Sequence, residues 1–325
     1  MINKDYPKIY IEQTDTPLPE PIPLGHSKYN NFKNLREGGI ASIKTCTDIC
    51  LGRTVAMKSL LPSARDIITE QKRFIREARV TSLLQHPNTP SVYEIGKDES
   101  GDLFFTMKYL QGKSLKFILN CLARSDKASE KEFNLKRLLS ILTKIIYGVA
   151  YAHEHGVIHR DLKPGNIQIG AFREVLVLDW GIAKVWDAPN EDDIVNQISR
   201  QGKGLDLTQM GPQPGTPLYM SPEQIRGDVI DERTDIYSLG AILYEILTLK
   251  NIFKANTMHD LLLKTKNEKP ILPSIIAPER YIPDRLEEIC MRAISKDRND
   301  RYPNVLELLH DIREFKYEAT VSSIV

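Results

Sequence analysis

Short runs of β-branched and aromatic residues dominate the chain from Tyr29 to about residue 110. Runs of this kind, bounded by turn residues, predict strands. The predicted strands are Ile40–Thr47, Thr54–Leu60, Ser91–Ile95 and Leu103–Tyr109. A turn at Gly52 separates the first two strands, and Ala64–Leu84 has the pattern of a helix. We therefore expect a small, mostly antiparallel sheet with one helix.

After about Gly112 the apolar residues recur at three- and four-residue steps, which is the spacing of a helix face. One such face consists of Leu138, Leu142, Ile145, Val149 and Ala152. A second face consists of Ile236, Leu239, Leu243 and Ile246. Further apolar residues flank the second face, so we expect that helix to be buried on most sides. Shorter helices are predicted near residues 257–266, 284–294 and 303–315.

Composition narrows the classes of protein that can contain these elements. Of the 325 residues, 41% are hydrophobic and 27% charged, and the formal net charge is +1, so neither nucleic acid nor a membrane surface is an expected partner. The longest apolar stretches are too short to span a membrane. The four cysteines are scattered, and the first ten residues lack the apolar segment of a signal peptide. We expect a cytoplasmic protein without disulfides.

A loop and the segment after it carry the candidate chemistry. The run Val157–Asn166 reads Val-Ile-His-Arg-Asp-Leu-Lys-Pro-Gly-Asn and places Asp161 and Asn166 five positions apart. A carboxylate there can accept the proton of an attacking hydroxyl, and an amide oxygen can bind a metal ion. Asp179 follows an apolar strand predicted at Val175–Leu178, and its carboxylate can hold Mg²⁺ against phosphate oxygens.

With these motifs the sequence resembles the protein kinase superfamily, and in particular the bacterial eukaryotic-like (Hanks-type) serine/threonine protein kinases. The likeness runs from about Tyr29 to Lys316. Two further runs carry it: Asp179-Trp180-Gly181-Ile182-Ala183-Lys184 and Gly215-Thr216-Pro217-Leu218-Tyr219-Met220-Ser221-Pro222-Glu223-Gln224.

The resemblance implies an α+β, bilobal protein-kinase-like fold. A small antiparallel sheet with one helix would form an N-lobe over residues 28–110, and a larger, mainly helical C-lobe would follow over residues 111–316. Residues 1–27 carry proline at positions 17, 19, 21 and 23, a spacing that favours an extended or disordered arm. Residues 317–325 would form a C-terminal tail.

The resemblance also implies an enzyme that transfers the γ-phosphate of ATP to Ser or Thr hydroxyls of protein substrates and that also phosphorylates itself. The implied catalytic residues are Lys58, Glu77, Asp161, Lys163 and Asn166. By this resemblance, Lys58 would bind the α- and β-phosphates and form an ion pair with Glu77. Asp161 would accept the hydroxyl proton, and Lys163 would neutralise charge on the transferring group. Two Mg²⁺ ions are implied, on Asn166 and Asp179.

The nucleotide site is implied residue by residue from the same resemblance. Leu35, Ile43 and Ala56 would roof the adenine beside the loop glycine Gly38. Met107 would be the gatekeeper, and the backbones of Lys108 and Leu110 would meet the adenine edge. Further contacts would come from Ser114 at the ribose and Gln168 beneath the adenine.

Several supporting residues have structural roles in the family. Thr216 would brace the catalytic aspartate, and together with Lys163 it favours serine and threonine over tyrosine as acceptors. Glu223 and Arg301 would form a buried ion pair. Asp235 would hold the backbone of residues 159–161.

The sequence departs from the family pattern in its glycine-rich loop. The run Arg36-Glu37-Gly38-Gly39-Ile40-Ala41 has only the middle one of the three expected glycines in place. Because glycines let the backbone approach phosphate, we expect slower turnover or weaker ATP binding. The segment from Asp179 to Glu223 is long, and Ser199 and Thr208 are its candidate phosphorylation sites.

Two other functions remain open from the sequence. The degenerate glycine loop and the polar Gln168 motivate a nucleotide-binding pseudokinase that acts as a scaffold with weak or no catalysis. A small-molecule phosphotransferase on a related fold is the second alternative, and the Pro222-Glu223 segment argues against it. The pattern gives no oligomeric state and no particular target protein.

Overall fold

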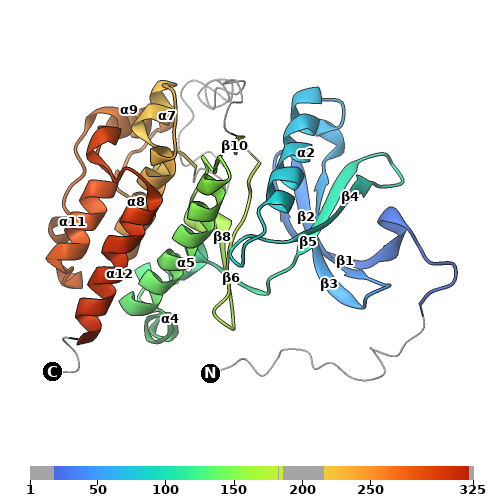
Figure 1. Cartoon of the computed structure of the whole chain (residues 1–325), viewed down its shortest axis with the longest axis horizontal. Helices are drawn as coiled ribbons and strands as arrows, with labels where there is room; N and C mark the ends of the chain where they lie inside the picture. The colour runs from blue at the N-terminus through green and yellow to red at the C-terminus, as the bar shows by residue number, and fades with distance from the viewer. Residues whose placement is uncertain (1–17, 182, 186–215, 322–325) are drawn as a thin grey trace. The chain divides into compact units, whose positions relative to one another are not determined.

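The computed structural model describes residues 18–181, 183–185 and 216–321. The chain divides into two compact units. The first unit contains the residues up to Gly112 together with Ile169–Ile182, and the second contains Lys113–Gln168 and the residues from Ala183 onward. Each unit is described on its own below (Figure 1).

An antiparallel sheet of order β1-β2-β3-β5-β4 forms the first unit. Its strands are β1 (Tyr29–Glu37), β2 (Ala41–Asp48), β3 (Arg53–Leu60), β4 (Val92–Lys97) and β5 (Leu103–Lys108), preceded by the 3-10 turn η1 (Gly25–Lys28). The four strands predicted from the β-branched runs are β2, β3, β4 and β5, with ends that differ by at most two residues. Gly52 turns the chain from β2 to β3 with a φ of +66°.

The helix α2 (Ile68–Leu83) lies on one face of this sheet (Figure 1). It begins four residues later than the sequence predicts, because Pro62–Ala64 forms the separate 3-10 turn η2. Ile67, which precedes α2, has an extended backbone with φ −92° and ψ 100° and so stops the helix from extending backward.

Cross-strand pairing assigns the site-bearing residues of the sheet to one face. Directly paired residues point to the same side of an antiparallel sheet. Ile43 pairs with Lys58, and Ala56 pairs with Met107. Met107 packs against the buried cluster beside α2, which consists of Ala41, Leu60, Ala64, Phe74, Ala78 and Phe105. A second buried cluster contains Tyr29, Cys46, Val55, Met57 and Phe104.

The strands β6 (Gly112–Ser114), β8 (Ile167–Gly170) and β9 (Val175–Val177) form a further sheet of order β6-β8-β9. The backbones of Gly112 and Ile169, which both belong to the first unit, approach very closely. A side chain at position 112 would stand 1.9 Å from the carbonyl oxygen of Ile169, so only glycine fits there.

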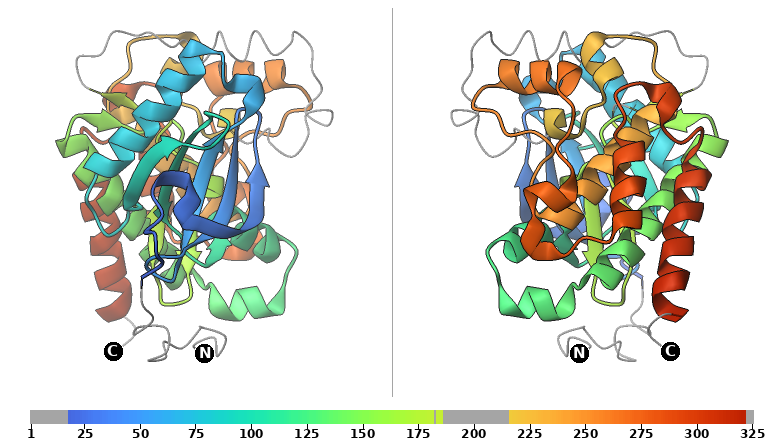
Figure 2. Two further views of the ribbon diagram at one scale, coloured as in Figure 1. Left: turned by 90° about the vertical axis from the view of Figure 1, so that its right-hand side faces the viewer. Right: turned by 90° about the vertical axis from the view of Figure 1, so that its left-hand side faces the viewer.

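The second unit is mainly helical, as the sequence predicts (Figure 2). Its α-helices are α3 (Leu115–Ala123), α4 (Lys127–Glu132), α5 (Leu135–Glu154), α7 (Pro222–Arg226), α8 (Arg233–Thr248), α9 (Met258–Asn267), α10 (Pro273–Ile276), α11 (Asp284–Ala293) and α12 (Val305–Val321). Its shorter elements are β7 (Val157–Ile158), η3 (Pro164–Asn166), β10 (Lys184–Val185), η4 (Thr216–Tyr219), η5 (Pro278–Arg280) and η6 (Arg298–Asp300). The strands β7 and β10 pair in antiparallel fashion.

The core of this unit is built around α8. Every residue from Thr234 to Thr248 is buried, which confirms the expectation that this helix is covered on most sides. Helices α5, α11 and α12 pack against it. The predicted apolar face of α5 is fully buried, and α12 continues to Val321, beyond the predicted end near residue 315.

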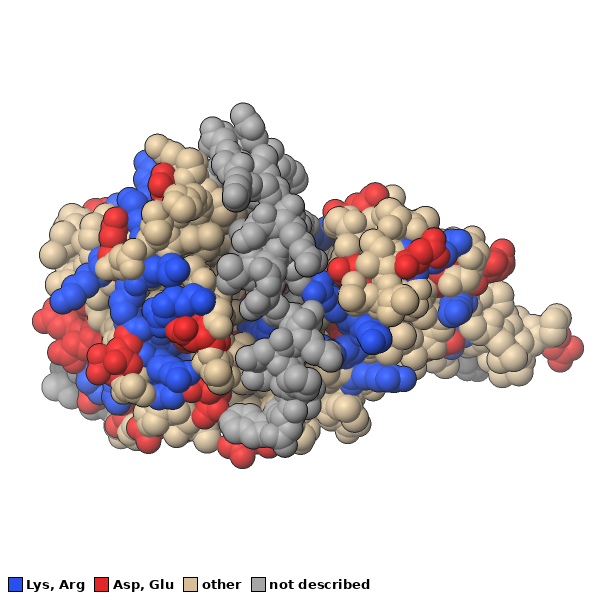
Figure 3. Space-filling view, turned by 90° about the horizontal axis from the view of Figure 1, so that it is seen from above, with Lys and Arg blue, Asp and Glu red and all other residues tan. Residues whose placement is uncertain are grey.

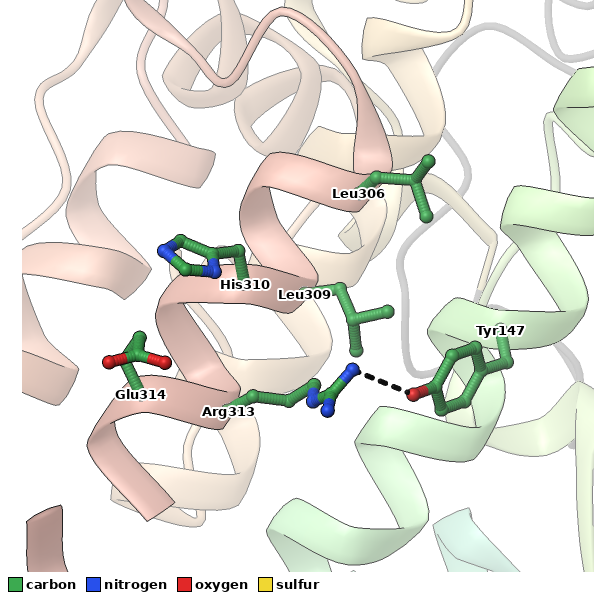
Figure 4. Close-up of a pocket in the computed structure, with 6 residues that line it drawn as sticks. All are labelled: Tyr147, Leu306, Leu309, His310, Arg313 and Glu314. Carbon is green, nitrogen blue, oxygen red and sulfur yellow. Dashed lines mark hydrogen bonds between the residues drawn. The ribbon is translucent and has the colours of Figure 1, made fainter. Parts of the chain in front are cut away.

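A surface hollow of about 340 Å³ lies at α5 and α12, and none of its lining residues is a predicted site residue (Figure 4). Its lining residues are Tyr147, Leu306, Leu309, His310, Arg313 and Glu314. Arg313 donates a hydrogen bond to the Tyr147 hydroxyl at 3.3 Å and closes one side of the hollow.

Three further expectations concern the cysteines, membrane-spanning helices and the N-terminal arm. All four cysteines are free. Within the described ranges, no helix has both the length and the apolar character that crossing a membrane requires. Residues 18–24, the described part of the predicted arm before η1, contain neither helix nor strand.

Candidate active site

Lys58, Glu77 and Asp179 come together in the first unit from three separate elements. Lys58 lies on β3 and Glu77 on α2, and Asp179 follows β9. The Lys58 ammonium is 2.5 Å from Glu77 Oε1 and 3.5 Å from Asp179 Oδ1. Glu77 is buried and the Lys58 side chain is 12% exposed, whereas the aspartate side chain is 41% exposed. The arrangement leaves one carboxylate open to a ligand beside a largely covered cation.

The electrostatics of this cluster keep Lys58 charged. Burial alone lowers the pKa of a lysine, but the carboxylates of Asp179 and Glu77 outweigh burial and raise the pKa of Lys58 above its ordinary value. Burial raises the pKa of Glu77, with a further contribution from Asp179, while Lys58 opposes the shift. A charged ammonium at this position is suited to contacts with phosphate oxygens.

The backbone around Asp179 is held by residues outside the predicted site. Asn88 donates its side-chain amide to Val175 O at 2.8 Å and accepts from Val177 N at 2.8 Å, which ties β9 to the end of the loop after α2. Trp180 is fully buried and donates to Val177 O at 3.2 Å. Asp179 itself has a φ of +68°, a conformation that is uncommon for residues other than glycine.

The residue after Trp180 is a glycine that lies close to the Glu77 carboxylate, which limits the size of a side chain at position 181. A Cβ at this position would lie 2.9 Å from Glu77 Oε2. A larger residue would therefore press on the carboxylate that pairs with Lys58.

In the second unit, Asp161, Lys163 and Asn166 form a separate cluster in the loop after β7. Lys163 Nζ is 2.6 Å from Asp161 Oδ2. Asn166 lies in η3 and donates its Nδ2 to Asp161 O at 3.0 Å and to Asp161 Oδ2 at 3.1 Å. The aspartate is thus oriented from two sides, by one cation and one amide.

Asp235, at the start of α8, organises the backbone of this loop as the sequence predicts. It is fully buried and accepts from His159 N at 2.8 Å and from Arg160 N at 2.9 Å. His153, on α5, contacts the same carboxylate at 2.9 Å. Burial raises the pKa of the Asp235 carboxyl, but its partners outweigh burial and hold the pKa below the usual value.

A contact that sequence reasoning missed holds the same loop from the other side. Gln224 donates its amide to Arg160 O at 2.9 Å, and Arg160 has a φ of +69°. Gln224 lies at the end of the motif that begins at Gly215, but nothing in the spacing of that motif indicates which backbone group the Gln224 amide contacts.

The predicted ion pair of Glu223 and Arg301 is present and buried. Arg301 donates to both carboxylate oxygens, at 2.6 and 2.8 Å, and neither side chain is more than 2% exposed. Arg301 also donates to Ser295 O and Arg233 O. Burial raises the pKa of Glu223, but the arginine outweighs it, so the pKa lies below the ordinary value.

The predicted nucleotide residues are divided among the two units. Leu35, Gly38, Ile43, Ala56, Met107, Lys108 and Leu110 belong to the first unit. Leu35 is 50% exposed and sits at an irregularity of the β1–β2 register, whereas Ala56 is buried. Lys108, at the end of β5, donates its backbone N–H to Ser91 O at 2.8 Å. The predicted contact of Lys108 with the adenine edge uses its other backbone group, the carbonyl.

Ser114 and Gln168 belong to the second unit. Ser114 caps the N-terminus of α3, where its hydroxyl oxygen accepts from Phe117 N at 3.2 Å. The hydroxyl keeps its hydrogen and its second lone pair for the predicted contact with a ribose. Gln168 is half-buried on β8.

The degenerate glycine loop is a tight hairpin at the end of β1. Gly38 N donates to Ala41 O at 2.9 Å, and a Cβ on Gly38 would lie 3.2 Å from that oxygen. The glycine that the sequence retains is thus at the position where a side chain would be crowded. Thr216 begins η4, and Ser199 and Thr208 lie outside the described residues.

Each cluster, taken by itself, contains an oxygen atom of a kind that Mg²⁺ binds. Because Asn166 uses Nδ2 for both of its hydrogen bonds, its Oδ1 accepts none from any residue that the structure describes. The Asp179 carboxylate is partly exposed beside Lys58. Carboxylate and amide oxygens are ligands that Mg²⁺ accepts, together with phosphate and water.

Comparison with known proteins agrees with this geometry. A family model described as "Protein kinase domain" matches residues 29–311. The chain is 35% identical over 303 residues to "Serine/threonine-protein kinase PknD" of Protochlamydia amoebophila (strain UWE25), which covers 90% of this chain and 30% of that protein. It is 36% identical over 293 residues to the protein of the same name from Chlamydia caviae, covering 88% and 31%.

A third relative of that name, from Chlamydia trachomatis serovar L2, is 34% identical over 298 residues and is covered over 31% of its length. The chain therefore spans less than a third of the length of these curated relatives. The match of the family model over most of the chain shows the family nevertheless. This chain belongs to the protein kinase domain family.

Proposed function

We propose that the chain is an active serine/threonine protein kinase that transfers the γ-phosphate of ATP to Ser and Thr hydroxyls of protein substrates, itself included. The observation that carries the proposal is the largely covered Lys58 ammonium, 2.5 Å from Glu77 and 3.5 Å from Asp179. A nucleotide-binding pseudokinase would use the same cation, so support for catalysis comes from the oriented Asp161 carboxylate, which contacts Lys163 and Asn166. We place the kinase domain at residues 28–316, and the family model supports its core at residues 29–311.

In the proposed reaction, Lys58 binds the α- and β-phosphates and Glu77 fixes the position of its ammonium. Both groups come from regular elements, β3 and α2, so their positions are set by the packing of the first unit. Ala56 and Met107, which are paired across β3 and β5, would contact the adenine on the same face of the sheet. This half of the chemistry is binding and orientation.

Asp161 accepts the proton of the substrate hydroxyl as its oxygen attacks phosphorus. Asn166 Nδ2 and Lys163 Nζ both contact Asp161 Oδ2, so the carboxylate is oriented before substrate arrives. Lys163 then neutralises charge that develops on the transferring group, which has a loose transition state with charge spread over its oxygens. Asp235 holds the backbone that carries Asp161.

Asp179 and Asn166 would hold Mg²⁺, through the carboxylate and through the amide oxygen that makes no hydrogen bond with the described residues. Bound Mg²⁺ neutralises negative charge on the β- and γ-phosphates. The residues of the chain supply the remaining interactions described above. We also propose protein substrates and a cytoplasmic setting, the latter supported by four free cysteines.

Label transfer from γ-labelled ATP tests the proposal. Purified protein with Mg²⁺ and a generic protein substrate should incorporate label on Ser and Thr, as shown by phosphoamino-acid analysis. The Lys58→Met variant should incorporate none, whereas Lys72→Met, which changes an exposed lysine on α2, should match the parent. Equal and negligible label in the parent and in Lys58→Met would support the scaffold alternative.

A further inference from the structure

Lys296 lies just after α11 and holds the end of a different helix. Its Nζ donates to the carbonyl oxygens of Thr265 and, at 3.4 Å, Lys264, which belong to the last turn of α9. The same ammonium is 4.4 Å from the centroid of the buried Phe253 ring. Lys296 thereby joins α9, the segment before α9 and the end of α11.

The charged groups around Lys296 do not include a close carboxylate. No described Asp or Glu oxygen lies within ion-pairing distance of its Nζ. Arg301 and Arg226 are the positive groups that act on it, and Glu268 is the negative one. The side chain of Lys264, on the packed helix, reaches away to Lys254 O. Among the residues that the structure describes, the direct acceptors of the ammonium are therefore neutral carbonyl oxygens and an aromatic face.

This environment raises the fraction of Lys296 that is a neutral amine above that of an ordinary lysine. Burial, then repulsion by Arg301 and Arg226, lower the pKa of Lys296 from 10.5 to about 8, and Glu268 only partly opposes them. At neutral pH the free-amine fraction is therefore on the order of a few hundred times that of an ordinary lysine. The free amine, and not the ammonium, is the nucleophile.

We propose that Lys296 is an acylation site that reacts with small acyl phosphates. The amine nitrogen attacks the carbonyl carbon of the donor, and a nitrogen–carbon bond forms. The bond from that carbon to the phosphate oxygen breaks, phosphate leaves with the electron pair, and the amine proton passes to water. The product is an uncharged amide with a single N–H.

The surface suits an anionic donor. Lys and Arg side chains gather, with some acidic ones among them, on the face of the helical unit turned to the viewer in Figure 3, which is the face where α7 and α9 lie in Figure 1. Arg226 is exposed there, and positive surface potential raises the local concentration of anions. Lys296 itself is partly exposed.

Acylation would weaken the attachment of α9. The amide keeps one N–H for the two carbonyl oxygens and loses the cation–π contact with Phe253. Helix α9 packs against α7 and η4, which carry Glu223 and the residues just before it. The modification would thus reach the segment that the Glu223–Arg301 pair anchors, and it does not depend on phosphotransfer.

The test incubates the full chain with acetyl phosphate and follows each lysine by peptide mass spectrometry. At about pH 7.5 we expect Lys296 to be acetylated on the order of ten-fold faster than the exposed Lys254 and Lys269, and its rate to level off near pH 8. A Lys296 rate equal to or below that of Lys254 would overturn the proposal.

Hydrogen exchange tests the consequence separately. Acetylated protein, and the variant Lys296→Gln, should exchange the amides of the last turn of α9 faster than the parent, while Lys296→Arg should stay close to it because the charge is retained. If Lys296→Gln does not fold, the acetylated parent alone decides the result. Unchanged exchange in α9 after stoichiometric acetylation at Lys296 would contradict the proposed weakening.

Discussion

Replacing Asp235 by Asn removes one charge and one acceptor from a fully buried position. In the parent, Oδ2 accepts from His159 N and contacts His153, and Oδ1 accepts from Arg160 N. An asparagine can put its single oxygen on only one side. Whichever way the amide turns, its NH2 group faces a backbone N–H of residue 159 or 160, and that donor loses its acceptor.

The cost follows from these contacts. A hydrogen bond to a charged group contributes about 1.5–3 kcal/mol, and a buried donor left without a partner costs a further ~1–3 kcal/mol. We expect Asp235→Asn to lose about 3–5 kcal/mol of unfolding free energy, within the range for breaking a buried charged network. Asp228→Asn makes the same chemical change at a carboxylate that is 49% exposed, so it should change stability by less than about 0.5 kcal/mol.

Catalysis should respond in a particular way. Asp235 positions the backbone that carries Asp161, whereas Ala56 and Met107, which are proposed to contact the adenine, belong to the first unit. The variant should therefore lower kcat, on the order of ten-fold or more, and leave the KM for ATP nearly unchanged. Urea unfolding followed by circular dichroism and initial-rate kinetics measure the two effects. A variant as stable as the parent, or one with raised KM and parental kcat, would refute the reasoning.

Three other perturbations give separate expectations. Lys58→Met should abolish label transfer, whereas Lys72→Met should preserve it, as measured by initial rates. Gly181→Ala should lower kcat/KM, because its Cβ would lie 2.9 Å from Glu77 Oε2 and displace the partner of Lys58; a parental value would show that the carboxylate can yield at no cost. Glu223→Gln should cost about 3–5 kcal/mol at neutral pH. The folded state lowers the pKa of Glu223, so the ionised carboxylate contributes its full stabilisation at pH values above the ordinary pKa of 4.5. That stabilisation is lost as the pH falls through the pKa of the folded state. The difference in unfolding free energy between parent and variant, measured with urea, should therefore shrink in acid.

The elements that sequence alone predicts well are those with a strong local period. The faces of α5 and α8 follow from apolar spacing, and the pairing of Lys58 with Glu77 follows from motif order along β3 and α2. Such features depend on residues a few positions apart or on a family pattern. Both kinds of signal are present in one sequence.

Other features depend on contacts between segments far apart in the chain. The Asn88 amide meets Val175 O across 87 positions, and the Gln224 amide meets Arg160 O across 64. In both contacts the acceptor is a backbone carbonyl, so no residue type in the sequence indicates which group accepts. The left-handed backbone at Asp179 could not be predicted from residue type either, because glycine usually indicates that conformation and position 179 is an aspartate.

Comparison of the parent with Asp161→Ala, using γ-labelled ATP, Mg²⁺ and a protein substrate, tests whether this chain performs phosphoryl transfer with the proposed proton acceptor. The expected result is label on serine and threonine with the parent and almost none with the variant, while both bind ATP equally well in equilibrium dialysis. Equal labelling by the two proteins would contradict the role of Asp161. Absence of labelling by the parent, despite ATP binding, would contradict the kinase activity itself.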